Sequence, residues 1–414
     1  MDERMSRREF KRLEAVERVR TGQLNNEEAA QGLGISGRQL RRVRARVARL
    51  GPKGVLHGNR GRRPRHRVAE AVRARVVELR REKYGGFNDQ HFSEKLAEVE
   101  GVQLSRTSVR RILRAAGIGA EQKRRAPQHR RRRERRAQGG MLVLWDGSTH
   151  AWLEGRGPEL CLLAAMDDAT GEVLAGAQFM ERECAVGYLQ LIMAMAAHHG
   201  LPWSIYMDHH GSLVRNDDHW SAQELRRGKQ DPTQVGRVLE ELNIEVITAL
   251  TPQAKGRVER LWRTLQDRLV SELRLAGACT QAAANLVLKE FIGPFNRRFS
   301  VAAAEAQPAW RAVDESLDLP RICSFSYVSK VLNDNTVRLQ KTVIDIAPGA
   351  GRRSYARCPV TVNQLLDGSW RVYYRDHLIA TATPPCGQEL RALKGTNRLR
   401  YRREREQAAL QAGI

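Results

Sequence analysis

The chain has 414 residues, enough for two to four domains of roughly 100–200 residues each. Lysine and arginine (71) outnumber aspartate and glutamate (47), so the formal net charge is +24. An excess this large attracts polyanions, of which nucleic acid is the commonest. No apolar run approaches the roughly 18 residues of a spanning helix, no apolar signal core opens the sequence, and the scattered cysteines form no CxxC pair. These features exclude secreted, membrane-spanning, collagenous and wholly disordered proteins and favour an intracellular protein with reduced thiols.

The first 50 residues predict a helix-turn-helix domain. Apolar residues recur at helical spacing up to Leu33, a short turn follows, and residues 37–50 form an apolar stripe surrounded by arginines. Ser36 is placed to cap that last helix. A helix, a glycine-containing turn and a basic helix are typical of DNA-binding helix-turn-helix units, although a solvated amphipathic helix is the alternative. The candidate DNA contacts are Arg38, Arg41, Arg42, Arg44 and Arg46.

Residues 67–120 predict a second helical, helix-turn-helix-like domain with a weaker pattern. Valine and leucine recur at helical spacing from Val68, and Ser105 is placed to cap a later helix. Structural packing explains this pattern about as well as DNA binding does. The candidate DNA contacts are Arg106, Arg110 and Arg111. Basic linkers over residues 51–66 and 121–139 flank the domain and could follow phosphates.

The rest of the chain predicts a mixed α/β core over residues 140–315, a small β-barrel or sandwich over 320–385, and a basic tail over 386–414. In the core, apolar strands are expected near residues 141–148, 160–168, 172–179, 203–208 and 244–250, with helices at 184–199, 254–276 and 280–298. The expected fold class is therefore multidomain α+β.

Three carboxylates stand out in the core. Asp146 ends the first strand, Asp208 ends the fourth, and Glu259 lies early on a helix. Acids at strand ends lie at the edge of the sheet, where open α/β sheets bind ligands. Three such acids close together need divalent cations, and their oxygen donors suit Mg²⁺ or Mn²⁺. The sequence predicts that they hold two metal ions for phosphodiester chemistry.

Other acids and bases near this site are weaker candidates. Taken singly, a strand-end aspartate is often a turn residue. Asp217 and Asp218 compete for the role of second acid, and Asp167 and Asp168 are either metal ligands or part of a hairpin turn. On the helix of Glu259, two basic residues on the same face are candidate DNA contacts: Lys255 and Arg263.

The segments WDGS, YMDHHGS and PQAKGRVERLWRTLQDRL together resemble the D…D…E signature of the integrase and transposase catalytic core, which has a ribonuclease H-like fold. The last segment resembles bacterial insertion-sequence transposases of the ISNCY group and their relatives, and the resemblance covers most of the chain. It implies that Asp146, Asp208 and Glu259 are the catalytic, metal-binding acids.

The same resemblance implies a DNA transposase that binds terminal inverted repeats and catalyses Mg-dependent cleavage and strand transfer. Such an enzyme acts on double-stranded DNA as a dimer or higher oligomer. It has no membrane partner and is expected in the bacterial cytoplasm, associated with the nucleoid.

One departure concerns the spacing of the acids. Asp208 and Glu259 are 51 positions apart, longer than in compact family members, and the extra length is expected in a polar insertion over residues 216–236. Such a surface insertion costs the fold little. Two rival functions remain: a ribonuclease H-like nuclease without strand transfer, and a transposase-derived DNA-binding regulator without catalysis.

Overall fold

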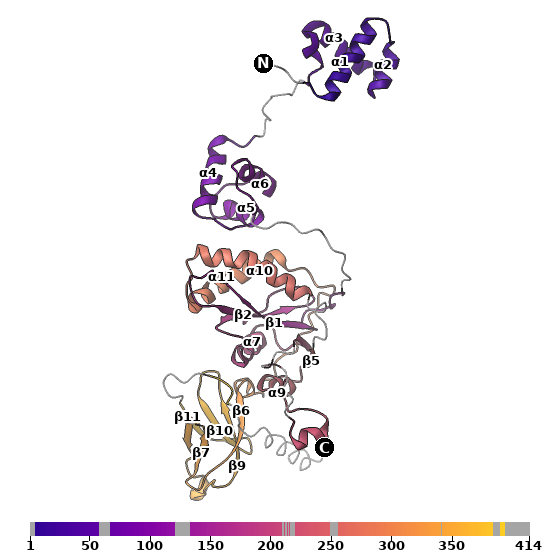
Figure 1. The fold of residues 1–414 in the computed structure, drawn as a ribbon. Helices are drawn as coiled ribbons and strands as arrows, with labels where there is room; N and C mark the ends of the chain where they lie inside the picture. Colours follow the sequence, from indigo (N-terminus) through magenta and orange to yellow (C-terminus); the bar gives the residue numbers. More distant parts are fainter. Residues whose placement is uncertain are drawn as a thin grey trace. The chain divides into compact units, whose positions relative to one another are not determined.

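A computed structural model describes residues 5–57, 67–120, 133–208, 211, 213, 215, 220–248, 256–340, 342–383 and 390–393. The chain forms two compact units, Met1–Arg75 and Val76–Ile414, shown with their elements in Figure 1. None of the described helices is long and apolar enough to cross a membrane.

The first unit has the predicted helix-turn-helix order. Its helices are α1 (Arg7–Arg20), α2 (Asn26–Leu33) and α3 (Gly37–Leu50). Gly34 ends α2 with a left-handed φ of 61°, and the Ser36 hydroxyl accepts a hydrogen bond from the Gln39 amide at 3.2 Å. The predicted cap of α3 is therefore confirmed.

The expected linker after α3 begins later than predicted. A 3₁₀ helix, η1 (Gly51–Val55), contacts both α1 and α3. Val55 is fully buried in the same apolar cluster as Leu40. Gly54 lies so close to the backbone of α3 that a Cβ there would be 2.5 Å from atoms of Arg46. The start of the glycine-rich segment thus belongs to the folded domain.

The second helical region contains α4 (Glu70–Glu82), α5 (Asp89–Glu98) and α6 (Arg106–Ala115). The Ser105 hydroxyl caps α6 by accepting a hydrogen bond from the Ser108 amide at 3.3 Å, as predicted. Arg114 on α6 pairs with Asp89 on α5 at 2.8 Å. Together with the fully buried Leu113, this pair holds α5 and α6 together.

A five-stranded sheet lies at the centre of the second unit, with strand order β3-β2-β1-β4-β5. Its strands are β1 (Val143–His150), β2 (Leu160–Asp167), β3 (Gln178–Met180), β4 (Ser204–Met207) and β5 (Glu245–Thr248). β1 pairs antiparallel with β2 and parallel with β4. The third strand is shorter than predicted because Gly176, at φ 94°, breaks the extended run against α7.

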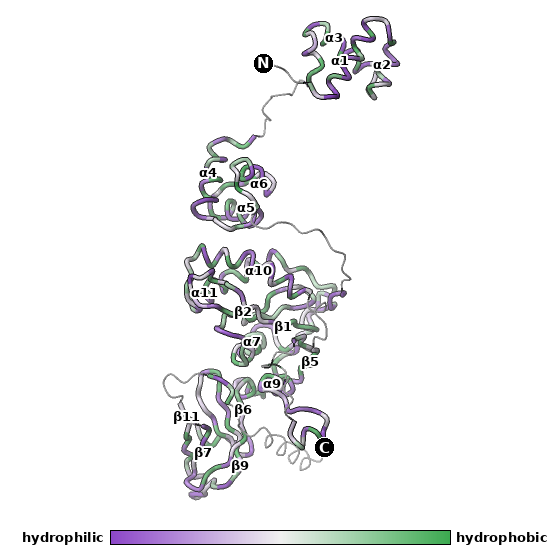
Figure 2. Tube along the Cα trace, viewed as in Figure 1, coloured by the Kyte–Doolittle hydropathy of each residue, from purple (hydrophilic) through white to green (hydrophobic). Residues whose placement is uncertain are grey.

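Helices cover both faces of this sheet. One face carries α10 (Gly256–Leu275) and α11 (Gln281–Phe299), and the other carries α7 (Ala185–His198) and α9 (Gln234–Glu241) (Figure 1). Leu144 packs on the α10 side and Trp145 on the α7 side, as expected for alternating strand residues. Figure 2 shows hydrophobic and hydrophilic residues alternating along α10, which buries one stripe of the helix against the sheet.

The predicted polar insertion is partly helical. It contains α8 (Ala222–Arg227) and ends in α9, whose Gln234 side chain exchanges two hydrogen bonds of 3.0 Å with the backbone of Ser326. Arg237 on α9 donates to the backbone oxygen of Ser324 at 2.5 Å. The end of the insertion therefore anchors the C-terminal β region.

The C-terminal region is an open sheet with a hairpin. Its strands are β6 (Phe325–Lys330), β7 (Thr336–Leu339), β8 (Thr342–Asp345), β9 (Pro359–Gln364), β10 (Trp370–Tyr374) and β11 (His377–Ala382), preceded by α12 (Leu319–Ile322) and with η3 (Ala350–Arg352) between β8 and β9. The sheet order is β11-β10-β9-β6, and β7 pairs only with β8 among the described strands. The hairpin contacts both edge strands, β6 and β11. The described strands form no closed hydrogen-bonded ring, so the predicted small β-barrel is not closed.

Candidate functional site

The strand register brings two of the predicted acids to neighbouring positions. In the parallel pairing of β1 with β4, Val143 lies opposite Ile205. Asp208 follows Asp146 by 62 positions, the same offset, so the register continued to the ends of these paired segments sets Asp146 beside Asp208. Asp146 lies in the middle of β1, which continues to His150, so the prediction that this acid ends the first strand is wrong. Asp146 and Asp208 follow Leu144 and Tyr206 by two positions each, which places both acids on the α10 side of the sheet, and both are half-buried.

The helix of the third acid lies over Asp146. Trp262 on α10 is almost fully buried, and its indole Nε1 donates a hydrogen bond to Asp146 Oδ2 at 2.7 Å. Glu259 lies one helical turn earlier, in the first turn of α10, and its side chain is exposed. Among the described residues, no three acidic, histidine or cysteine side chains are grouped closely enough to hold a metal ion. The extended register thus sets Asp146 opposite Asp208, and Glu259 lies one helical turn from the tryptophan that binds Asp146.

Two residues beside this edge were not identified from the sequence. The hydroxyl of Tyr188 on α7 donates a hydrogen bond to Glu183 Oε1 at 2.6 Å. A Cβ at Gly147 would lie 2.7 Å from Glu183 Oε2, so a larger residue there would displace that carboxylate. Burial, followed by the charges of Glu183, Asp146 and Asp208, raises the pKa of Tyr188. Tyr188 therefore stays a neutral hydrogen-bond donor among three carboxylates. In the sequence, an acid just before an apolar helix, Glu183, was the one sign of this contact.

Asp167 and Asp168 serve the backbone. Asp167 accepts hydrogen bonds from the amides of Gly140 (2.9 Å) and Thr170 (2.8 Å), which fixes the predicted hairpin turn. Asp168 is fully buried and pairs with Arg133 at 2.5 Å and with Arg257 in the first turn of α10. Its contacts join the basic linker to the start of α10. The turn interpretation therefore accounts for Asp167, and pairing with arginines accounts for Asp168.

The candidate DNA-binding arginines lie mostly on open surfaces. On α3, Arg38, Arg41 and Arg42 are exposed, whereas Arg44 and Arg46 are half-buried. Arg44 donates a hydrogen bond to Asn26 on α2 at 2.6 Å, so part of its capacity is used within the domain.

On α6 and α10, the remaining described candidates are exposed: Arg106, Arg110, Arg111 and Arg263. Lys255, Asp217 and Asp218 lie outside the described residues.

Comparison with known proteins adds sequence relatives. The provisionally assigned transposase y4bF of Sinorhizobium fredii is 38% identical over 314 residues, covering 76% of this chain and 67% of the relative. The transposase for insertion sequence IS1202 of Streptococcus pneumoniae is 32% identical over 327 residues, covering 70% of this chain and 68% of the relative. This chain belongs to the insertion-sequence transposases. In this transposase, a winged helix-turn-helix family model matches residues 12–74, the segment that contains α2 and α3.

Solved structures match this transposase only distantly. An intasome of simian T-cell lymphotropic virus with the PP2A regulatory subunit B56γ covers 75% of this chain and 100% of that chain, at 14% identity and a TM-score of 0.30. The HTLV-2 integrase catalytic core domain with magnesium covers 37% of this chain and 87% of that chain, at 16% identity and a TM-score of 0.26. Similarities at this level do not establish a shared fold.

Proposed function

We propose that this transposase is a DDE-type enzyme that cuts DNA at the ends of its element and joins the freed 3′-hydroxyls to target DNA. The proposal rests on the offset of the β1–β4 pairing, which sets Asp146 opposite Asp208 when it is extended by two positions, and on Trp262, which links Asp146 to the helix of Glu259. Asp208 directly follows β4, at the carboxyl end of a parallel strand, where open α/β sheets bind their ligands.

The donor chemistry of this edge fits a hard divalent cation. Mg²⁺ is typically held by one or two carboxylates together with substrate phosphates and water, and the half-buried Asp146 and Asp208 carry such oxygens. When bound, a pair of Mg²⁺ or Mn²⁺ ions would activate the attacking oxygen and neutralise the leaving one. Glu259, exposed one turn from Trp262, is the third ligand in this proposal.

DNA binding is assigned to the helices with exposed arginines. Arg41 and Arg42 on α3, with Arg110 and Arg111 on α6, would contact the terminal inverted repeats, and Arg263 the reacting end. Handling two element ends together requires at least a dimer on DNA. The work of such an enzyme is on the bacterial chromosome, in the nucleoid.

The test uses the purified protein, Mg²⁺ and a labelled duplex that carries the element's end. Asp208→Asn and Glu259→Gln should reduce cleavage by roughly 100-fold or more, because metal-held charge contributes several kcal/mol to such reactions. DNA binding should be unchanged. Asp231→Asn, in a buried acid of the insertion, and Glu240→Gln, on a helix surface, are the matched controls and should cleave normally.

The same assay separates the two rival functions. Cleavage without joined products, in wild type, would indicate a ribonuclease H-like nuclease. Binding of the end without cleavage by wild type or any variant would contradict the proposal and favour a DNA-binding regulator.

A further inference from the structure

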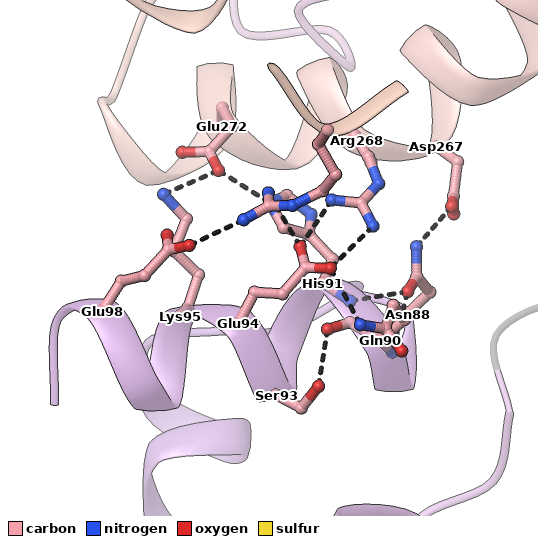
Figure 3. Close-up of polar contacts among 11 residues, drawn as sticks. Asn88, Gln90, His91, Ser93, Glu94, Lys95, Glu98, Asp267, Arg268 and Glu272 are labelled. Carbon is pink, nitrogen blue, oxygen red and sulfur yellow. Dashed lines mark hydrogen bonds and ion pairs between the residues drawn. The ribbon is translucent and has the colours of Figure 1, made fainter. Parts of the chain in front are cut away.

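A polar docking face joins the second helical region to the helices that cover the sheet. It consists of His91, Glu94 and Lys95 on α5 with Arg268 and Glu272 on α10, and Figure 3 shows the α5 side chains pointing toward α10. At its edges, Asn88 bonds Asp267, and Glu98 pairs with Arg298 of α11 at 2.7 Å. These five residues and the two pairs at their edges form the docking face.

Each charge of the docking face meets an opposite charge. Arg268 donates two hydrogen bonds to Glu94, of 2.7 and 3.3 Å, and Arg298 lies 3.0 Å from the same carboxylate. Glu272 Oε1 lies 2.7 Å from both Lys95 Nζ and His91 Nε2. Burial by itself would raise the pKa of Glu94 and Glu272. Hydrogen bonds from Arg268 and Gln90 to Glu94, and from His91 and Lys95 to Glu272, instead hold both pKa values below the ordinary range.

In the described part of the chain, the two apolar clusters on the faces of the sheet do not extend to α5 or α6. A cavity of about 310 Å³ remains beside the ion pairs, between Lys95 and the apolar side chains of Phe291 and Phe295. Ion pairs taken out of water add little net stability, but they fix the geometry of the partners that they join.

The docking face lies between a DNA-binding candidate and a catalytic candidate. α6 is tied to α5 through Arg114 and Asp89, and its exposed Arg110 and Arg111 point to DNA contact. On the other side, Arg268 follows Glu259 by nine positions on one continuous helix, a rise of about 14 Å. DNA held on α6 is thereby kept at a set distance from the acid of α10.

We propose that the docking face sets the position of the cut: it holds α6 and the catalytic helix in one register, so that cleavage falls at one distance from the sequence that α6 binds. This inference rests on the proposed function. The expected effect is specific. Weakening the docking face should spread the positions at which DNA is cut, although the arginines of α6 and the acid of α10 are unchanged.

The experiment reverses the Lys95–Glu272 pair. Lys95→Glu and Glu272→Lys each set like charges against each other, and the double variant restores an opposite pair across the same gap. Lys229→Glu, in the exposed pair that Lys229 forms with Glu240 of α9, is the matched charge control. Cut positions are mapped to the nucleotide on a labelled end, and the same end is footprinted with a nuclease in the absence of Mg-dependent cleavage.

Wild type, the control and the double variant should cut at one position and protect one continuous stretch. Each single variant should spread its cuts over several nucleotides, with yield at the main position down roughly tenfold, and should lose the part of the footprint next to the cut. Amide exchange of α5 should rise in the same two variants. Glu272→Gln, which keeps the side-chain shape, replaces any reversal that does not fold.

Two results distinguish a failure of the docking-face inference from a failure of the proposed function. An unchanged cut and footprint in both single variants, with faster exchange of α5, would overturn the role of the docking face. Absence of cleavage in wild type would overturn the proposed function instead, and the footprints and exchange rates would then decide alone whether the face holds α6 in register.

Discussion

The two helical regions share a local design and differ in how they are attached. In each, a serine caps the last helix, Ser36 before α3 and Ser105 before α6, and exposed arginines follow the cap. The first region closes its own apolar cluster around Leu40 within residues 5–55. The second also has a buried core, but the outer surface of its middle helix carries the docking face.

The capped, arginine-rich helix (α3 or α6) is thus similar in both regions, whereas the contacts that join a region to the rest of the chain depend on the middle helix. The middle helix of the first region, α2, exposes Glu27 and Glu28 to solvent. The middle helix of the second region, α5, directs Glu94 and Lys95 into ion pairs with another part of the chain. A few charged residues on one helix therefore decide whether a helix-turn-helix-like module belongs to its own unit or to that of the sheet.

The largest effect should come from a large-to-small substitution in the apolar core of each helical region. Leu40→Ala and Leu113→Ala each remove a fully buried side chain and should cost about 2–5 kcal/mol of local stability. Amide exchange should rise only within residues 5–57 for Leu40→Ala. For Leu113→Ala it should rise in α6, α5 and the α10 turns around Arg268, and confinement to α6 alone would contradict the shared unit.

A smaller effect should separate the two sets of arginines. Arg41→Ala with Arg42→Ala on α3, and Arg110→Ala with Arg111→Ala on α6, each remove two side chains that are candidates for binding phosphate. The slope of log affinity against log salt should become shallower by about 0.9 for every phosphate that is no longer neutralised. Filter binding across a salt series measures this slope, with Lys229→Ala as the control, and an unchanged slope would remove that helix from the DNA interface.

The smallest effect should appear on acidification. Because the pKa values of Glu94 and Glu272 are lowered in the folded protein, their stabilisation is complete above the ordinary value of 4.5 and is lost as the pH falls below it toward the folded values. The thermal midpoint of wild type should therefore fall as the pH is lowered below 4.5. Glu272→Gln should show a smaller fall, and equal slopes would show that the docking face does not titrate.

Local features of the fold were predictable because they depend on neighbours in sequence. The caps at Ser36 and Ser105 follow from short-range hydrogen bonds, and the buried stripe of α10, with Leu265 fully buried, follows from helical periodicity. The third strand was predicted too long. The positive φ of Gly176 interrupts a segment whose composition alone favours a strand.

The site was predictable in its residue types but not in its contacts. The register of β1 against β4 joins residues about 60 positions apart, and Trp262 meets Asp146 across 116 positions. No local pattern encodes such pairings. Asp168 illustrates the reverse case, since a strand-end acid with the composition of a metal ligand turned out to bind arginines. The roles of Asp146, Asp208 and Glu259 stay predictions.

The contacts of Asp168 also bear on how firmly the docking face must hold. Arg133, within the basic linker, pairs with Asp168, and the helical region before the linker reaches Ile118, so the tether between these two anchors is 15 positions of sequence. A tether converts docking into an intramolecular event with an effective concentration in the millimolar range. A weak polar face is then sufficient for continuous engagement, and lengthening the tether twofold would cost only about 0.6 kcal/mol.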